Sequence, residues 1–200
     1  MYKQMPLEYQ SLEPFISDRT LDIHYNKHYL NYLNKLNNLL EKVGYKGNLA
    51  KEEMVKQIDV FNIKDRGEIL YNLGGVLNHE LYFKNMSDKK NNLPVGEIKK
   101  AIINQYGSFD EFKKEFIKTS KELVGSGYTF VVINSSKKLD IINLPNQDTP
   151  YMFDLVPIMA LDLWEHAYYL DYQNRRDEYI NNFFSIIDFE KINEIYKENI

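Results

Sequence analysis

Apolar side chains recur at helical spacing over two long segments in the first half of the chain. In residues 18–43 the apolar and aromatic positions fall on one arc at about 100° per residue, and Gly44 follows as a C-terminal cap. The same period returns over residues 63–86. Gly74 and Gly75 lie inside this second segment, although a glycine in a helix costs about 1 kcal/mol relative to alanine. The pattern therefore predicts two helices, the second of them closely approached at its glycine pair.

The period changes in the second half of the chain, where alternating segments separate shorter helical ones. The predicted elements are, in order, helices over 97–105 and 109–124, strands over 128–133, 139–144 and 154–161, and a helix over 164–172. A further helical pattern lies near the C-terminus. Ser108 and Glu111 form a capping box at the start of the second of these helices. The first two strands are joined by a polar turn and predict a β-hairpin. An all-helical half therefore precedes an α+β half.

A polar stretch over residues 87–96 separates these two halves. Its Asp-Lys-Lys-Asn-Asn run and its Leu-Pro pair are typical of a surface linker, because such residues favour turns over regular structure. We therefore expect two domains, a helical hairpin domain over residues 1–88 and a mixed domain over residues 89–200.

Composition and charge narrow the class of protein. Of 200 residues, 44% are apolar and 27% are charged, which is typical of a globular chain and not of a disordered one. The net charge of -4 argues against nucleic-acid binding, because phosphate backbones attract clustered positive charge. No apolar run approaches the roughly 20 residues of a membrane-spanning helix, and the first residues lack the apolar core of a signal peptide. We therefore expect a cytoplasmic protein that binds neither nucleic acid nor membranes.

Cysteine is absent, so a metal site in this chain has only histidine, carboxylate and solvent as ligands. The chain has 4 histidines, which are His24, His28, His79 and His166. His24 and His28 can face one site from consecutive helical turns, although this spacing also arises by chance. Asp162 and His166 can converge where the third strand gives way to a helix; an ordinary capping aspartate beside a partly buried histidine is the alternative. The absence of His-Glu-x-x-His and Glu-x-x-His motifs disfavours zincins and di-iron bundles.

Sequence blocks along the whole chain resemble those of the iron/manganese superoxide dismutases. The blocks are, in order, Pro6-Leu7-Glu8-Tyr9 with Leu12-Glu13-Pro14, His24-x-x-Lys27-His28-x-x-x-Tyr32, Asn72-x-Gly74-Gly75-x-x-Asn78-His79, Gly107-Ser108-Phe109, Gly125-Ser126-Gly127, Asn146-Gln147-Asp148-Thr149-Pro150, Asp162-x-Trp164-Glu165-His166-Ala167-Tyr168-Tyr169 and Tyr172-Gln173-Asn174-Arg175-Arg176. The resemblance implies an α+β fold, in which an N-terminal antiparallel helical hairpin is followed by an α/β C-terminal domain with a three-stranded antiparallel sheet.

The resemblance also implies a metal centre and a reaction. By position, the family's ligands for one manganese or iron ion per subunit match His24, His79, Asp162 and His166, with a water or hydroxide as a further ligand. Imidazole and carboxylate groups suit these two metals. The implied enzyme is a superoxide dismutase. It converts two superoxide anions to dioxygen and hydrogen peroxide by one-electron cycling of the metal.

Other positions match residues that surround the metal in the family. His28 and Tyr32 match a gateway pair on the substrate channel, and Gln147 matches the amide that hydrogen-bonds the metal-bound solvent. Glu165 and Tyr169 match residues that bond the partner subunit, which implies a homodimer and leaves a tetramer open. The position of the glutamine, outside the second helix, favours manganese over iron, although relatives that use either metal share it.

The aromatic side chains depart from the family pattern. Many relatives have tryptophan where this chain has Phe83, Tyr128, Phe130 and Phe184. Tyr25 and Tyr29 stand where histidine is frequent, and Trp164 is the only tryptophan. An alternative function is therefore that of a metal-binding structural or coat-associated family member with weak dismutase activity. A zinc-dependent hydrolase is a third hypothesis, which the closed, amide-lined site of the family disfavours.

Overall fold

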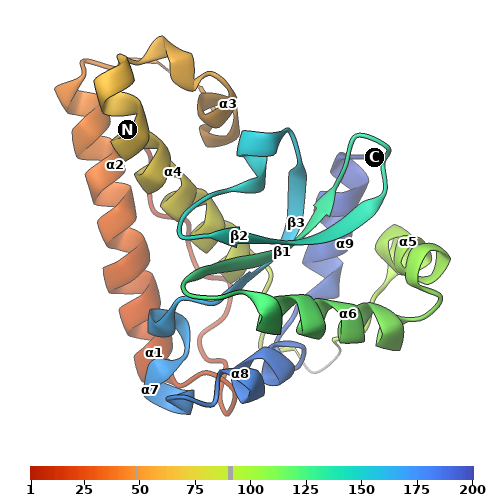
Figure 1. The fold of residues 1–200 in the computed structure, drawn as a ribbon. Coiled ribbons are helices and arrows are strands. Elements are labelled where there is room, and N and C mark those ends of the chain that lie inside the picture. The colour runs from red at the N-terminus through yellow and green to blue at the C-terminus, as the bar shows by residue number, and fades with distance from the viewer. Residues whose placement is uncertain (48, 90–91) are drawn as a thin grey trace.

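The computed structural model describes residues 1–47, 49–89 and 92–200. Two long helical runs lie side by side and antiparallel in the N-terminal half (Figure 1). The elements of this half are α1 (Asp18–Ile23), the π-helical turn η1 (His24–Tyr29), α2 (Leu30–Lys42), α3 (Lys51–Lys56), the 3-10 turn η2 (Ile58–Val60) and α4 (Ile63–Lys84). Leu33, Leu36 and Leu40 on α2 are buried, so the apolar stripe that predicts the helix is also its packing face.

The two helices predicted for this half are present, with two differences. Residues 24–29 form a π-helical turn, which interrupts the predicted α-helix between α1 and α2. Such turns are rare and often occur at functional sites. The connection between the two runs contains α3, which the hydrophobic pattern does not predict because the helix is only 6 residues long. Gly44 follows α2 with a φ of 70°, as its predicted capping role requires.

A three-stranded antiparallel sheet lies in the C-terminal half, as predicted. Its strands are β1 (Gly127–Ile133), β2 (Leu139–Pro145) and β3 (Val156–Asp162), in the order β2-β1-β3. The predicted start of the third strand is wrong by two residues. The chain makes a 3-10 turn, η3 (Pro150–Phe153), and then takes a left-handed conformation at Asp154, where φ is 55°. Because of this turn, the strand begins two residues later than expected, at Val156, and ends on Asp162.

Helices surround the sheet (Figure 1). They are α5 (Gly96–Tyr106), α6 (Phe109–Glu122), the 3-10 turn η4 (Glu165–Ala167), α7 (Tyr169–Tyr172), α8 (Arg176–Phe183) and α9 (Phe189–Glu198). The predicted cap of α6 is present, because the Ser108 hydroxyl accepts a hydrogen bond from the Glu111 amide at 3.1 Å. The continuous helix predicted over 164–172 is wrong. It is broken at Tyr168, whose φ of -142° is not helical.

The N-terminal and C-terminal halves meet where α4 packs against β3. Gly74 also lets α4 approach the loop after β2, since a Cβ atom there would lie 2.0 Å from the carbonyl oxygen of Gln147. Gly75 faces the ring of Tyr32, which a Cβ atom would approach to 2.5 Å. The close approach predicted from the glycine pair is confirmed on both sides. No helix within the described ranges is long and apolar enough to span a membrane.

We expect Gly74→Ala to lower the free energy of unfolding by about 1–3 kcal/mol, because the added methyl group meets backbone that cannot move aside cheaply. Gly67 on the same helix is the matched control, since a Cβ atom there meets nothing within 4 Å. Gly67→Ala should raise stability by up to about 1 kcal/mol through its better helix propensity. Urea unfolding of the two variants checks this, and equal effects would contradict the close approach.

Candidate metal centre

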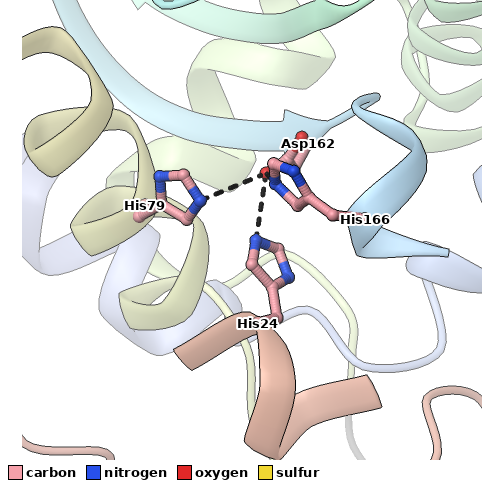
Figure 2. Close-up of side chains that lie close together, drawn as sticks. All are labelled: His24, His79, Asp162 and His166. Atoms are coloured by element: carbon pink, nitrogen blue, oxygen red, sulfur yellow. Dashed lines mark hydrogen bonds and ion pairs between the residues drawn. The ribbon is translucent and has the colours of Figure 1, made fainter. Parts of the chain in front are cut away.

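Four side chains from distant parts of the chain converge between the hairpin and the sheet (Figure 2). His24 begins the π-helical turn, His79 lies on α4, Asp162 is the last residue of β3, and His166 lies in the turn η4. We call these four residues the histidine–aspartate cluster. Each offers one ligand atom, and these atoms all lie within 4.8 Å of one another. The structure thus brings together all four residues that the family resemblance implies as ligands.

The Asp162 carboxylate is the centre of this cluster. Its Oδ2 atom lies 3.1 Å from Nε2 of His24, 3.2 Å from Nε2 of His166 and 3.8 Å from Nε2 of His79. Oδ1 accepts a hydrogen bond from the backbone amide of Trp164 at 2.8 Å, which fixes the plane of the carboxylate. One oxygen is therefore held by the backbone, and the other faces three imidazoles.

Burial sets the charge of the cluster. His24, His79 and Asp162 have at most 2% of their side-chain surface exposed. Burial lowers the pKa of His24 to about 4 and that of His79 well below its ordinary value, so both rings are neutral near pH 7. Burial alone would raise the pKa of Asp162. The charge and hydrogen bond of His166 and the hydrogen bond of His24 outweigh it and hold that pKa below its usual range. A buried carboxylate beside the neutral rings of His24 and His79 has the protonation states that a bound cation requires.

The tautomer of His79 also fits a metal ligand. Its Nδ1 atom lies 2.6 Å from the carbonyl oxygen of Gly75, one helical turn earlier, and donates a hydrogen bond to it. Nε2 then presents a lone pair into the cluster, where it is buried and has no hydrogen-bond partner among the residues that the structure describes. Buried polar atoms are nearly always paired, so this nitrogen is placed to bind a cation. The donor set of three imidazoles and one carboxylate suits manganese or iron.

A glutamine and a tyrosine lie beside the cluster. Gln147 is fully buried, and its Nε2 donates a hydrogen bond to the hydroxyl of Tyr32 at 3.1 Å. The ring of Tyr32 lies 5.3 Å from that of His79. The Oε1 atom of Gln147 has no hydrogen-bond partner among the described residues. An amide with one satisfied end and one free end next to the metal site is suited to bonding a solvent molecule there.

His28 lies at the edge of the site and not inside it. Its ring stacks on that of His166, with centroids 4.3 Å apart and planes 19° apart. The ring of Trp164 is also parallel to that of His166, at 5.7 Å. Glu165 and Tyr169 are exposed, Tyr169 to 48%. The structure therefore separates the predicted site residues into a buried centre, an edge and a surface.

Three buried tyrosines lie around the site; Tyr82 and Tyr179 escape the sequence analysis, which names Tyr128 only as a replacement for tryptophan. The hydroxyl of Tyr179 donates to the carbonyl oxygen of Asp162 at 2.9 Å, and the hydroxyl of Tyr82 lies 3.0 Å from that of Tyr179. The hydroxyl of Tyr128 lies 3.3 Å from Nδ1 of His79. The sequence offers one signal for Tyr82: it follows His79 by three residues, so the two side chains are neighbours on one face of the helix. Tyr128 is opposite Asp162 across β1 and β3, a register that no spacing in the sequence reveals.

Comparison with known proteins identifies relatives of both halves. The family model for the α-hairpin domain of iron/manganese superoxide dismutases matches residues 1–87, and the model for the C-terminal domain of the same family matches residues 94–195. The chain is 37% identical over 191 residues to a protein of Listeria ivanovii named superoxide dismutase [Mn], with 96% of this chain and 94% of that protein covered. A protein of the same name from Listeria monocytogenes serovar 1/2a matches with the same identity and coverage.

We expect the metal-free protein to lose stability as the pH falls from about 6.5 to about 4. In this window the unfolded state binds a proton at His24 and the folded state does not, so the free energy of unfolding decreases on acidification. The loss from His24 is about 3 kcal/mol, and His79 adds to it in the same direction. Urea unfolding in the presence of a chelator measures this dependence. His24→Gln should make it shallower, and an unchanged slope would contradict the neutral, buried imidazole.

Proposed function

The chain belongs to the iron/manganese superoxide dismutase family, and on this premise we propose that its histidine–aspartate cluster holds one manganese or iron ion per subunit. The protein is a superoxide dismutase, an oxidoreductase that converts two superoxide anions to dioxygen and hydrogen peroxide. The observation that supports this placement of the metal is the unpartnered Nε2 of His79, which faces the buried carboxylate of Asp162 at 3.8 Å.

The family uses either of two metals, and the relatives named above favour manganese. When bound, the metal supplies the one-electron oxidation of one superoxide and the one-electron reduction of the next. Asp162 contributes a negative charge that offsets the charge of the ion, and the imidazoles contribute neutral donors. The backbone bonds from Trp164 and to Gly75 hold these donors in place before any ion binds.

We further propose that Tyr32 and Gln147 deliver protons to the substrate. The reduction of superoxide to hydrogen peroxide takes up two protons, which the site has to deliver. Burial raises the pKa of Tyr32 well above its ordinary value, so the side chain keeps its proton. Since Gln147 donates to the phenol oxygen, the phenolic hydrogen stays available for another acceptor. His28 lies at the edge of the site and, with Tyr32, lines the approach of the substrate.

A homodimer completes the proposal. In it, Glu165 bonds His166 of the partner subunit and Tyr169 bonds His28 of the partner subunit. The exposed apolar side chain of Leu170, which follows Tyr169 in the chain and is 47% exposed, supports such an interface. We also infer that the linker divides the chain into domains over 1–88 and 89–200, and that the protein acts in the cytoplasm. The sedimentation experiment below also tests whether two dimers associate into a tetramer.

We expect fast, metal-dependent superoxide decay in pulse radiolysis of the protein, reconstituted separately with manganese and with iron and normalised to bound metal. Asp162→Ala should lower metal affinity by more than about 100-fold, because even the loss of an outer hydrogen-bond partner of a metal site costs 10–100-fold. Asp177→Ala is the control, since Asp177 forms a surface ion pair with Lys121 at 2.9 Å. Tight metal binding without catalytic decay would instead favour a structural, metal-binding role.

We expect Glu165→Ala to weaken the dimer, because His166 then loses its hydrogen-bond partner across the interface. A lost hydrogen bond to a charged group costs about 1.5–3 kcal/mol, or roughly 10-fold or more in the dimer dissociation constant. Sedimentation velocity over a range of dilutions measures this constant. Glu178→Ala is the control on the exposed surface, where Glu178 pairs with Arg175 in its own chain at 2.9 Å. Equal dissociation of the two variants would exclude this contact.

A further inference from the structure

One buried tyrosine lies against a ligand of the histidine–aspartate cluster and has no part in the proposed dismutation. Tyr29 is 0% exposed, and its ring stacks on that of His79, with centroids 6.1 Å apart and planes 16° apart. It is the last residue of the π-helical turn that begins with His24. The phenol therefore touches the metal site through a ligand ring, although its hydroxyl points elsewhere.

The hydroxyl of Tyr29 has a carboxylate as its hydrogen-bond acceptor. It donates to Oε1 of Glu80 at 2.7 Å and accepts a hydrogen bond from the Met5 amide at 2.9 Å. Glu80 is held in turn by Lys51, whose Nζ atom lies 2.6 Å from the same oxygen, and its side chain is 14% exposed. Burial and the neighbouring Glu80 raise the pKa of Tyr29 well above its ordinary value, so the phenol is neutral. Its proton has a ready acceptor that reaches the solvent.

A second tyrosine continues the path to the surface. The ring of Tyr25 lies 5.7 Å from that of Tyr29, and its side chain is half-buried. Its hydroxyl donates to the backbone carbonyl of Met5, beside the amide that bonds Tyr29. The rings of His79, Tyr29 and Tyr25 thus form a continuous aromatic series from the metal site to the outside of the α-hairpin.

We propose that Tyr29 and Tyr25 form a redox relay, which carries oxidising equivalents from the metal site towards the protein surface, where a reductant in solution consumes them. The inference rests on the proposed metal site. Hydrogen peroxide is a product of the reaction, and a reduced metal ion converts it to a one-electron oxidant of the hydroxyl-radical class. An oxidant formed beside His79 attacks the ligand histidines unless a better electron donor lies within reach. Tyr29 is the buried donor that stacks on this ligand ring.

The electrons and protons of the relay balance in three steps. First, Tyr29 gives one electron to the oxidant, which becomes hydroxide, and gives its phenolic proton to Glu80. Second, Tyr25 gives one electron to the Tyr29 phenoxyl radical, Glu80 returns the proton to Tyr29, and Tyr25 releases its own proton to water. This proton and the hydroxide make one water molecule. Third, a thiol-class reductant in solution gives a hydrogen atom to the Tyr25 radical, which restores the phenol.

The chain contains a second tyrosine pair that serves as a control. The ring of Tyr82 lies 5.2 Å from that of His24, and its hydroxyl bonds that of Tyr179 at 3.0 Å. Tyr179 donates in turn to the backbone carbonyl of Asp162, at 2.9 Å. Both rings are 1% exposed. This pair is as close to a ligand as Tyr29 is, but its hydroxyls bond no carboxylate among the described residues and both of its rings are buried, so it is not suited to proton-coupled oxidation.

The experiment treats the iron-loaded protein with hydrogen peroxide in the presence of mannitol, which removes radicals that escape into solution. Freeze-quenched electron paramagnetic resonance with ring-deuterated tyrosine identifies tyrosyl radicals, and peptide mass spectrometry measures the oxidation of His24, His79 and His166. In the unaltered protein we expect a tyrosyl radical on the half-buried residue Tyr25. In Tyr25→Phe the radical should remain on Tyr29 and last severalfold longer. In Tyr29→Phe the radical of this pair should disappear, and histidine oxidation should rise severalfold.

Tyr82→Phe should leave the radical and the histidine oxidation as in the unaltered protein. Equal effects of Tyr29→Phe and Tyr82→Phe, or no tyrosyl radical in a protein that retains iron and dismutates superoxide, would overturn the relay alone. Failure of the protein to retain iron or manganese would overturn the relay and the proposed metal site together. The parallel measurements of bound metal and superoxide decay distinguish these results.

Discussion

A carboxylate with no solvent exposure stands where three imidazoles meet, and the tertiary structure of this protein is built around it. Burying a charge is costly unless opposite charge or hydrogen bonds compensate for it. The backbone amide of Trp164 satisfies one oxygen of Asp162, and the other depends on side chains that come from the π-helical turn, from α4 and from η4. A cation in this place compensates for the carboxylate and pairs the free Nε2 of His79 at once, so metal binding and correct docking of the two halves stabilise each other.

Docking of the halves depends on two glycines as much as on the ligands. Gly74 lets the backbone of α4 reach the loop that contains Gln147, and Gly75 makes room for the ring of Tyr32. The Gly75 carbonyl also fixes the tautomer of His79. The same short segment of α4 therefore positions a ligand, the amide beside it and the phenol that this amide bonds. A side chain at either glycine would disturb all three, which explains why the helix tolerates the unfavourable propensity of two adjacent glycines.

The sequence predicts much of this fold and little of the geometry of the site. Helical periodicity, the Ser108 cap and the β-hairpin are local signals, and they place these elements within a residue or two. The breaks in the predicted helices are also local, but tertiary contacts cause them. The π-helical turn that begins at His24 and the non-helical Tyr168 carry no signature in the order of apolar residues. The left-handed conformation at Asp154, which delays the start of β3, could be predicted from the sequence, because aspartate tolerates this conformation. The convergence of His79 with Asp162 joins distant elements, and only the family resemblance indicated it.

Each tyrosine around the site brings a proton together with its ring, and the partner of each hydroxyl decides what that proton can do. The hydroxyl of the buried Tyr179 donates to a backbone carbonyl, which holds the strand end in place. Tyr32 accepts from the Gln147 amide, so its own hydrogen is available to another acceptor. Tyr29 donates to Glu80, which can take the proton when the ring is oxidised and return it afterwards. The same residue type thus supports structure and, in the roles proposed above, proton delivery and protection from oxidation, according to the group that the fold places against its oxygen.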